Sequence, residues 1–160
     1  MKLLLLAIGR MKGDCESGRV GEYITRARPF LRRMGFSSLE LREFPESRKP
    51  DAAARKLEEA ETLRRAAGKG AVFLAFDEGG ENLASEAFSR QLAKLAAGGG
   101  DTLALLIGGP DGLDPSLLAQ ARLVVSFGRM TWPHRLARLM AAEQLYRAAT
   151  IASGHPYHRP

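Results

Sequence analysis

Apolar runs of strand length recur along the chain and are separated by segments with helical periodicity. Four of these runs are apolar throughout, which is typical of strands buried on both faces, and the run at residues 36–44 alternates apolar and polar positions. Glycine, proline or polar residues bound the runs. The pattern predicts five strands, at residues 2–8, 36–44, 71–76, 102–107 and 123–127.

The segments between the predicted strands have apolar residues at helical spacing. Asp51 stands where it can cap one helix, and Gly68 stands where that helix is expected to stop. Pro29 is expected to end the first helix, because proline lacks a backbone N–H and its ring clashes with the preceding turn. The predicted helices cover residues 16–28, 51–67, 83–97, 115–120 and 134–152. Alternating strands and helices predict an α/β fold whose parallel sheet has helices on both faces.

The last predicted helix is apolar around most of its circumference. A helix of this kind is expected to be buried on two sides, one of them against the sheet. The other side can face a second subunit, most simply in a homodimer with twofold symmetry. It can equally lie deep in the core of a single chain, and periodicity alone favours neither arrangement.

Composition predicts one ordinary soluble domain spanning residues 1–160. The chain has 160 residues, of which 45% are hydrophobic and 26% charged, close to the average for globular domains. Cys15 is the one cysteine, so no intramolecular disulfide can form, and a reducing cytoplasm is the expected compartment. The apolar start is too short for a signal peptide, and no apolar run has the length of a membrane-spanning helix.

Charge is unevenly distributed and gathers near the carboxyl end. The formal net charge of the chain is +6, which makes polyanions plausible partners. Residues 129–160 contain one acidic residue, five arginines and all three histidines of the chain. The basic character of this segment points to a binding surface there.

A glycine-rich segment, Gly108-Gly109-Pro110-Asp111-Gly112, directly follows a predicted buried strand. In an open parallel sheet, ligands bind beyond the carboxyl ends of the strands, and residues 76–80 and 126–134 are expected at the same edge. The three segments predict an apolar-walled pocket suited to an adenosine-like ligand. Neither a dinucleotide nor a P-loop fingerprint occurs. A plain turn is an equally good reading of the glycine segment alone.

The last seven residues, Gly154-His155-Pro156-Tyr157-His158-Arg159-Pro160, are rich in chemically active groups for a terminus. No metal is expected here, because His155 and His158 have no carboxylate or cysteine companions nearby. An aromatic ring beside an arginine fits base stacking and phosphate binding. His134, at the start of the last helix, is read equally well as a helix cap or as a catalytic group.

Several motifs together closely resemble the ribosomal RNA large subunit methyltransferase H family, which are small SPOUT-class enzymes. The resemblance is continuous over the last third of the chain and specific in its combination of motifs. The motifs are the Gly-Gly-Pro-Asp-Gly segment, Thr131-Trp132-Pro133-His134, Tyr146-Arg147-Ala148 and His155-Pro156-Tyr157-His158-Arg159.

The resemblance implies a C-terminal trefoil knot, in which the last helix threads through a preceding loop, and a homodimer. It also implies methyl transfer from S-adenosyl-L-methionine to N3 of a pseudouridine in 23S ribosomal RNA of the large ribosomal subunit. The cofactor positions that it implies are Phe76, Gly108, Phe127, Gly128, Arg129, Met130, Thr131 and Trp132.

The resemblance further implies that Tyr157, His158 and Arg159 lie over the pocket, from the partner subunit, where they grip RNA and handle protons. Arg138 and Arg147 are expected to meet RNA phosphates or the dimer seam, and His134 to order the cofactor loop. His155 is expected to bind RNA or support the site. The sequence leaves two alternatives, which are a non-catalytic RNA-binding module and a nuclease or phosphatase in which His134 and His158 face one phosphate.

Overall fold

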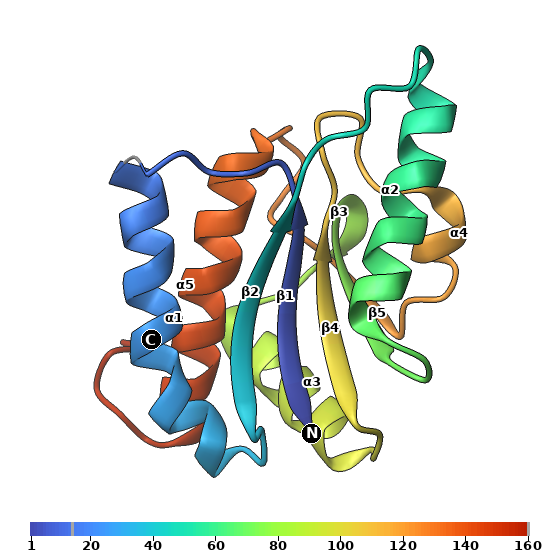
Figure 1. Ribbon diagram of the computed structural model, residues 1–160. Helices are drawn as coiled ribbons and strands as arrows, with labels where there is room; N and C mark the ends of the chain where they lie inside the picture. The colour runs from blue at the N-terminus through green and yellow to red at the C-terminus, as the bar shows by residue number, and fades with distance from the viewer. Residues whose placement is uncertain (14, 160) are drawn as a thin grey trace.

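A five-stranded parallel sheet forms the centre of the protein (Figure 1). The computed structural model describes residues 1–13 and 15–159. The strand order is β2-β1-β4-β3-β5, and every neighbouring pair is parallel. Along the chain the elements are β1 (Lys2–Ile8), α1 (Cys15–Arg33), β2 (Ser38–Phe44), α2 (Ala52–Ala67), β3 (Val72–Asn82), α3 (Ser85–Ala97), β4 (Thr102–Ile107), α4 (Pro115–Leu118), β5 (Leu123–Ser126) and α5 (His134–Ala152).

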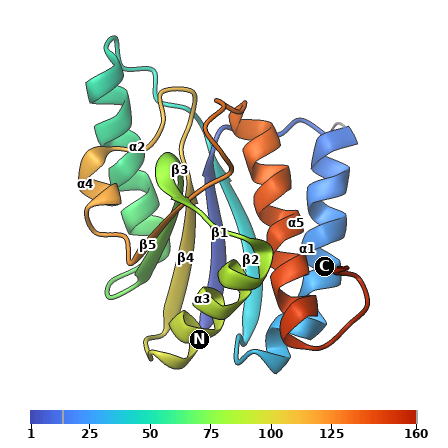
Figure 2. The ribbon, with the colours of Figure 1, turned by 180° about the vertical axis from the view of Figure 1, so that it is seen from behind.

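Helices cover both faces of the sheet, as the sequence predicts. Alternate side chains of β1 point into two separate cores, so that Leu3 and Leu5 pack with α1, α3 and α5, whereas Leu4 and Leu6 pack with α2 and the chain around α4. All four leucines are at most 3% exposed. Figure 2 shows α5 and α1 side by side on the first of these faces. Burial of both faces explains the uniformly apolar sequence of the central strands.

The register of the strands aligns their carboxyl ends at one edge of the sheet. Ile8 at the end of β1 lies opposite Phe44 at the end of β2, and Ala7 lies opposite Ile107 at the end of β4. Phe76 of β3 also pairs with Ile107. The segments that follow these strands therefore leave the sheet at the same edge, at the top of Figure 1.

Two predicted boundaries are wrong by more than two residues. Helix α1 continues past Pro29 to Arg33. Pro29 lies on the exposed face of the helix, whereas Ala27 before it and Leu31 after it are buried. Packing of the buried face offsets the hydrogen bond that proline removes. Strand β3 continues past Phe76, where its pairing with β4 ends, and it pairs again with β5 at Glu81 after a shift in register.

Helix α5 has the predicted bounds and lies between α1 and α3. Its buried residues include Ala141, Ala142 and Leu145, each 0% exposed, so much of its apolar surface is covered within one chain. Leu139 and Met140 are only partly buried and border an open hollow with Tyr23 of α1. A second subunit on this hollow, and the threading that makes the knot, stay predictions.

No helix among residues 1–13 and 15–159 combines the length and apolar character needed to cross a membrane.

Candidate functional site

A cavity of about 470 Å³ opens at the carboxyl edge of the sheet. Three segments that are distant in sequence form its walls, at the positions where the sequence predicts a pocket. The convergence is a consequence of the parallel strand order. The lining residues are Lys56, Phe76, Asp77, Glu78, Ile107, Gly108, Gly109, Pro110, Asp111, Gly112, Leu113, Pro115, Leu118, Ser126, Phe127, Gly128, Met130, Thr131, Trp132, His134 and Ala137.

The glycine segment forms a tight turn whose backbone faces the cavity. The N–H of Gly112 donates to the carbonyl oxygen of Gly109 at 3.0 Å, with Pro110 and Asp111 at the tip. Gly112 has a φ of +82°, which favours glycine. A Cβ on Gly108 would lie 2.6 Å from the carbonyl carbon of Gly112, so only glycine lets the turn close. Where Gly108, Gly109 and Gly112 line the cavity, its wall therefore consists of backbone atoms.

Two aromatic rings form the apolar wall. Phe76 stacks on Phe127 with ring centroids 5.0 Å apart and planes 9° from parallel, and it also contacts Phe88. Phe76 is only 7% exposed. Because Phe127 covers one face of the Phe76 ring, Phe76 offers little surface for stacking a ligand and acts mainly as support for Phe127.

Besides the stacking of Phe127 on Phe76, the segment after β5 is fixed by local hydrogen bonds and by one hydrogen bond to β3. Ser126 Oγ accepts from the N–H of Gly128 at 3.1 Å and donates to its carbonyl oxygen at 2.9 Å. Thr131 Oγ1 donates to Glu78 Oε2 at 3.3 Å. Met130 and Trp132, 73% and 41% exposed, stand at the rim of the cavity.

The cofactor positions implied by the resemblance are thus almost all at the cavity. Arg129 is the exception: it is exposed and does not line the cavity. Lys56 of α2 and Ala137 of α5 line the cavity although sequence analysis did not select them. Their local sequence gives no sign of a ligand site, because α2 and the start of α5 reach this edge only through the arrangement of the sheet and its covering helices.

Carboxylates surround the opening of the cavity. Asp77 and Glu78 line one side, and Asp77 Oδ1 accepts from the N–H of Gly79 at 2.9 Å. On the other side, the hydrogen bonds from Arg55 lower the pKa of Asp111, so that this carboxyl is ionised. Because Arg55 neutralises Asp111 and Lys56 also lines the cavity, it is Asp77 and Glu78 that favour a ligand with positive charge.

His134 lies in the wall of the cavity at the first residue of α5. Its Nε2 is 3.8 Å from Glu46 Oε1, and a Cβ on Gly9 would lie 2.8 Å from the same nitrogen. The residue before it, Pro133, holds the cap position and makes no side-chain cap bond. The ring of His134 therefore packs against the loop after β1 and the segment after β2, and its role in ordering the cofactor loop stays a prediction.

Arg138 corrects one expectation. It is 0% exposed, forms an ion pair with Glu43 of β2, and donates from Nη2 to the carbonyl oxygens of Ile8 and Gly9, both at 2.8 Å. Burial lowers the pKa of this guanidinium, and the Glu43 carboxylate opposes that shift. A fully buried side chain cannot meet an RNA phosphate, so the expected phosphate contact is wrong and Arg138 supports the fold.

The C-terminal tail packs on its own chain, away from the cavity. Tyr157 Oη donates to Glu143 Oε1 at 3.0 Å, and Arg147 Nε donates to the same oxygen at 3.0 Å. His158 Nε2 lies 2.6 Å from Glu86 Oε1 of α3. None of residues 154–159, the described part of the tail, lines the cavity. Because His158 and His134 have different surroundings, the structure does not support a nuclease that places both on one phosphate.

Tyr157 has a strongly perturbed hydroxyl. Burial is the main cause that raises its pKa, and hydrogen bonds with Tyr23 and Glu143 add to the effect. The raised pKa extends the protonated form further above neutral pH, and in this form the hydroxyl donates to Glu143.

The other two tail residues differ in their surroundings. The ring of His155 meets the edge of Phe30 with centroids 5.1 Å apart, whereas Arg159 is exposed.

Within residues 1–13 and 15–159, no three or more histidine, cysteine, aspartate or glutamate side chains are placed to hold a metal ion.

The fold and the cavity define the class of protein. The family model described as "Predicted SPOUT methyltransferase" matches residues 1–158, and the chain belongs to this family. A probable methylase family protein from Haemophilus influenzae Rd KW20 has the same fold, with a TM-score of 0.50 and 15% identity, covering 99% of this chain and 70% of that one.

Two curated relatives agree with the narrower resemblance seen in the sequence. The chain is 50% identical to the ribosomal RNA large subunit methyltransferase H of Methylocella silvestris and 46% identical to that of Rhizobium meliloti. Each comparison spans 159 residues and covers 99% of both chains. The resemblance stated from the motifs is confirmed over the whole length.

S-adenosyl-L-methionine is the methyl donor of SPOUT methyltransferases, and the cavity fits it. A cavity of about 470 Å³ lies within the range of small-molecule sites. Three of the five residues of the turn that lines the cavity are glycines, so its backbone can approach a ligand closely. Apolar walls suit the adenosine part, and the carboxylates of Asp77 and Glu78 suit the positive sulfonium and ammonium groups.

Proposed function

We propose that the chain transfers a methyl group from S-adenosyl-L-methionine to N3 of a pseudouridine in large-subunit ribosomal RNA. The observation that carries the proposal is the glycine-walled cavity at the carboxyl edge of the sheet, in a chain that matches ribosomal RNA large subunit methyltransferase H relatives over 99% of its length. The place of action is then the cytoplasm, where ribosomal RNA is found.

The cofactor is held largely by backbone groups of two segments, residues 108–112 and 127–132, with Phe76 supporting the apolar wall. When bound, it supplies an electrophilic methyl group on a positively charged sulfur. The contribution of the protein is to exclude water and to hold the accepting nitrogen in line with this methyl group. No covalent bond between the protein and the RNA is needed.

The accepting imide N–H is weakly acidic, so its proton needs an acceptor and the developing anion needs a positive partner. We assign RNA binding and stabilisation of this anion to Arg159, because its side chain is exposed. His158 is assigned to proton handling, since Glu86 lies 2.6 Å from its Nε2 and can orient the ring. Tyr157 is assigned to hydrogen-bond donation, because its hydroxyl already donates to Glu143 Oε1.

The tail and the cavity have to meet for this chemistry, and we infer that two subunits bring them together. In one chain residues 155–158 pack on α1, α3 and α5, and no tail residue from 154 to 159 lines the cavity. The hollow beside Tyr23, Leu139 and Met140 supports a homodimer, because these partly buried side chains offer an apolar surface to a second copy. Each site then consists of the cavity of one subunit and the tail of its partner.

Two measurements test the proposed function. Titration calorimetry should show one cofactor bound per chain, whereas a non-catalytic RNA-binding module would show no heat. Mass spectrometry of ribosomal RNA from a strain that lacks the gene should show one methyl group missing from a modified uridine, and its return when the gene is restored. Unchanged RNA would contradict the proposal.

A further inference from the structure

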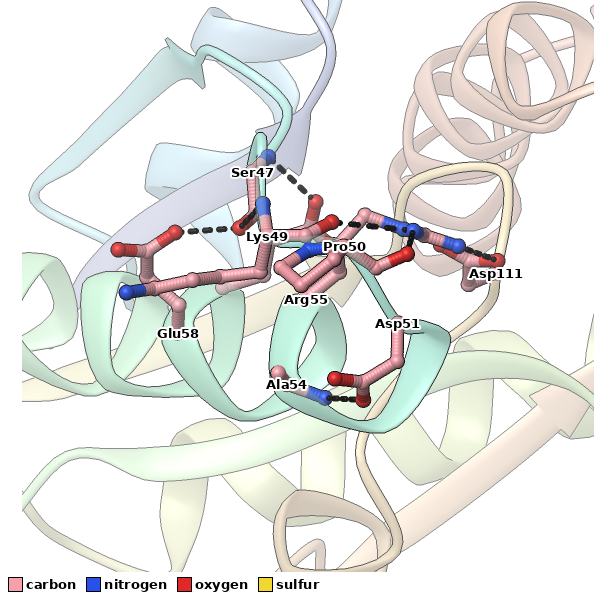
Figure 3. Close-up of polar contacts among 9 residues, drawn as sticks. Ser47, Lys49, Pro50, Asp51, Ala54, Arg55, Glu58 and Asp111 are labelled. Carbon is pink, nitrogen blue, oxygen red and sulfur yellow. Dashed lines mark hydrogen bonds and ion pairs between the residues drawn. The ribbon is translucent and has the colours of Figure 1, made fainter.

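Two side chains of α2 reach across to the glycine turn of the cavity. Arg55 and Glu59 stand four residues apart and so share one face of the helix. Figure 3 shows Arg55 lying between the loop that precedes α2 and Asp111 at the tip of the turn. Neither Arg55 nor Glu59 lines the cavity.

The guanidinium of Arg55 uses all of its nitrogens in these contacts. Nε donates to Asp111 Oδ2 at 2.6 Å and Nη2 donates to Asp111 Oδ1 at 3.1 Å, which makes a two-point contact. Nη1 donates to the carbonyl oxygens of Lys49 and Pro50, both at 3.1 Å. The planar guanidinium is bound on one side by the Asp111 carboxylate and on the other by the two carbonyl oxygens. It therefore fixes both the orientation of the Asp111 carboxylate and its distance from Arg55.

Glu59 packs against the same turn at Gly109. It is 6% exposed, and its Oε1 accepts from the N–H of Ser47 at 2.9 Å. A Cβ on Gly109 would lie 3.2 Å from Glu59 Oε2, so the carboxylate packs directly against the turn. The loop before α2 and the glycine turn are therefore tied to one helix.

From this geometry we propose that Arg55 is a positioning residue for the cofactor. Through Asp111 it holds the Gly108–Gly112 turn in the shape that the cofactor meets, without touching the cofactor. The inference rests on the proposed function and adds to it the residue that orders the binding turn before the ligand arrives. A preordered turn loses less conformational freedom on binding, so the contact raises affinity.

The expected signature is a change in cofactor affinity without a change in turnover. Arg55→Ala should raise the Kd for S-adenosyl-L-methionine about tenfold, because the turn must then be ordered by the ligand. The kcat at saturating cofactor and RNA should stay within about twofold of the unaltered chain, since no reacting group is changed. Arg55→Lys keeps the charge but loses the fork, and should raise the Kd about threefold.

Arg42→Ala is the matched control. Arg42 also makes a two-point contact with a carboxylate, that of Glu40, but on β2 and away from the cavity. Its loss should leave the Kd unchanged. A double-mutant cycle of Arg55→Ala and Asp111→Asn should be non-additive, because each change breaks the same contact.

Calorimetry on the intact chain separates the outcomes. A raised Kd in Arg55→Ala and Asp111→Asn, with a normal Kd in Arg42→Ala, would support the inference. A Kd within twofold of the unaltered chain in both Arg55→Ala and Asp111→Asn would overturn it, even if both variants unfold at lower urea concentration. No binding by the unaltered chain would overturn the proposed function, and this inference with it.

Discussion

Arg138 of α5 forms an ion pair with Glu43 of β2, and Arg138 is completely buried. The same guanidinium donates two hydrogen bonds to the end of β1 and the residue after it. This one side chain joins the last helix to the edge of the sheet from which the cavity opens. The start of α5 carries His134 and directly follows the segment after β5, which forms one wall of the cavity. Anchoring α5 through Arg138 therefore also fixes this wall.

Arg138→Met should destabilise the protein strongly. The change removes the buried partner of Glu43 and the hydrogen bonds to the carbonyl oxygens of Ile8 and Gly9, for an expected cost of about 3 kcal/mol in the free energy of unfolding. Urea unfolding followed by circular dichroism measures it. Arg32→Ala, an exposed arginine of α1, should change stability by less than about 0.5 kcal/mol. Equal stability of the two variants would contradict the structural role.

Gly108→Ala should weaken cofactor binding more than about tenfold, because the new Cβ would lie 2.6 Å from backbone of the turn and force it open. Calorimetry gives the Kd. Gly18→Ala is the control: its Cβ would meet nothing within 4 Å in helix α1, so it should bind normally and gain about 0.5–1 kcal/mol of stability. Normal binding by Gly108→Ala would show that the turn does not form the site.

Mixing two inactive variants should restore activity if each site takes its tail from the partner subunit. Gly108→Ala damages the cavity but leaves the tail, and Arg159→Ala should abolish methylation while sparing cofactor binding. In a mixed dimer, the intact cavity of one subunit meets the intact tail of the other, and random mixing should recover about a quarter of normal activity.

The mixing experiment is read by transfer of a radioactive methyl group to RNA after the two variants are refolded together. If the tail served its own subunit, no mixed dimer would have a complete site, and the mixture would stay inactive. Unchanged turnover by Arg159→Ala alone would remove Arg159 from the mechanism.

Glu59 should make stability fall as pH rises through the weakly acidic range. Burial raises its pKa above the ordinary value of 4.5, and the hydrogen bond from Ser47 only partly opposes this. A carboxyl with a raised pKa in the folded state binds a proton more tightly there than when unfolded. The favourable contribution of Glu59 to the free energy of unfolding is therefore present below about pH 4.5, and it is lost as the pH rises through the raised pKa of the folded state.

Glu59→Gln should remove this contribution to the pH dependence. The free energy of unfolding, measured in urea between about pH 4 and 7, should fall less steeply or rise more steeply with pH in the variant than in the unaltered chain. The difference between the two curves isolates Glu59 from Asp111 and Glu86, whose lowered pKa values act in the opposite direction. Parallel curves would contradict the prediction.

Much of the fold follows from local patterns. The bounds of β1, β4 and α5 agree with those predicted, because burial of two sheet faces or of a helix surface leaves an apolar pattern of the matching period. The end of α1 was missed because proline is a strong local signal, and only packing on α5 and β2 shows that the helix continues past it. The edge on which three segments converge was also predictable, since all the strands are parallel.

The sequence by itself determined the class of fold, the family and the glycine turn of the cavity, because periodicity and short motifs are properties of neighbouring residues. Only the tertiary structure decided which charged groups meet. It buried Arg138 against Glu43, joined Arg55 to Asp111 across 56 positions of the chain, and placed Tyr157 beside Glu143, away from the cavity. The physical reason is that the partner of a long charged side chain depends on strand order and helix packing, which the local pattern does not contain.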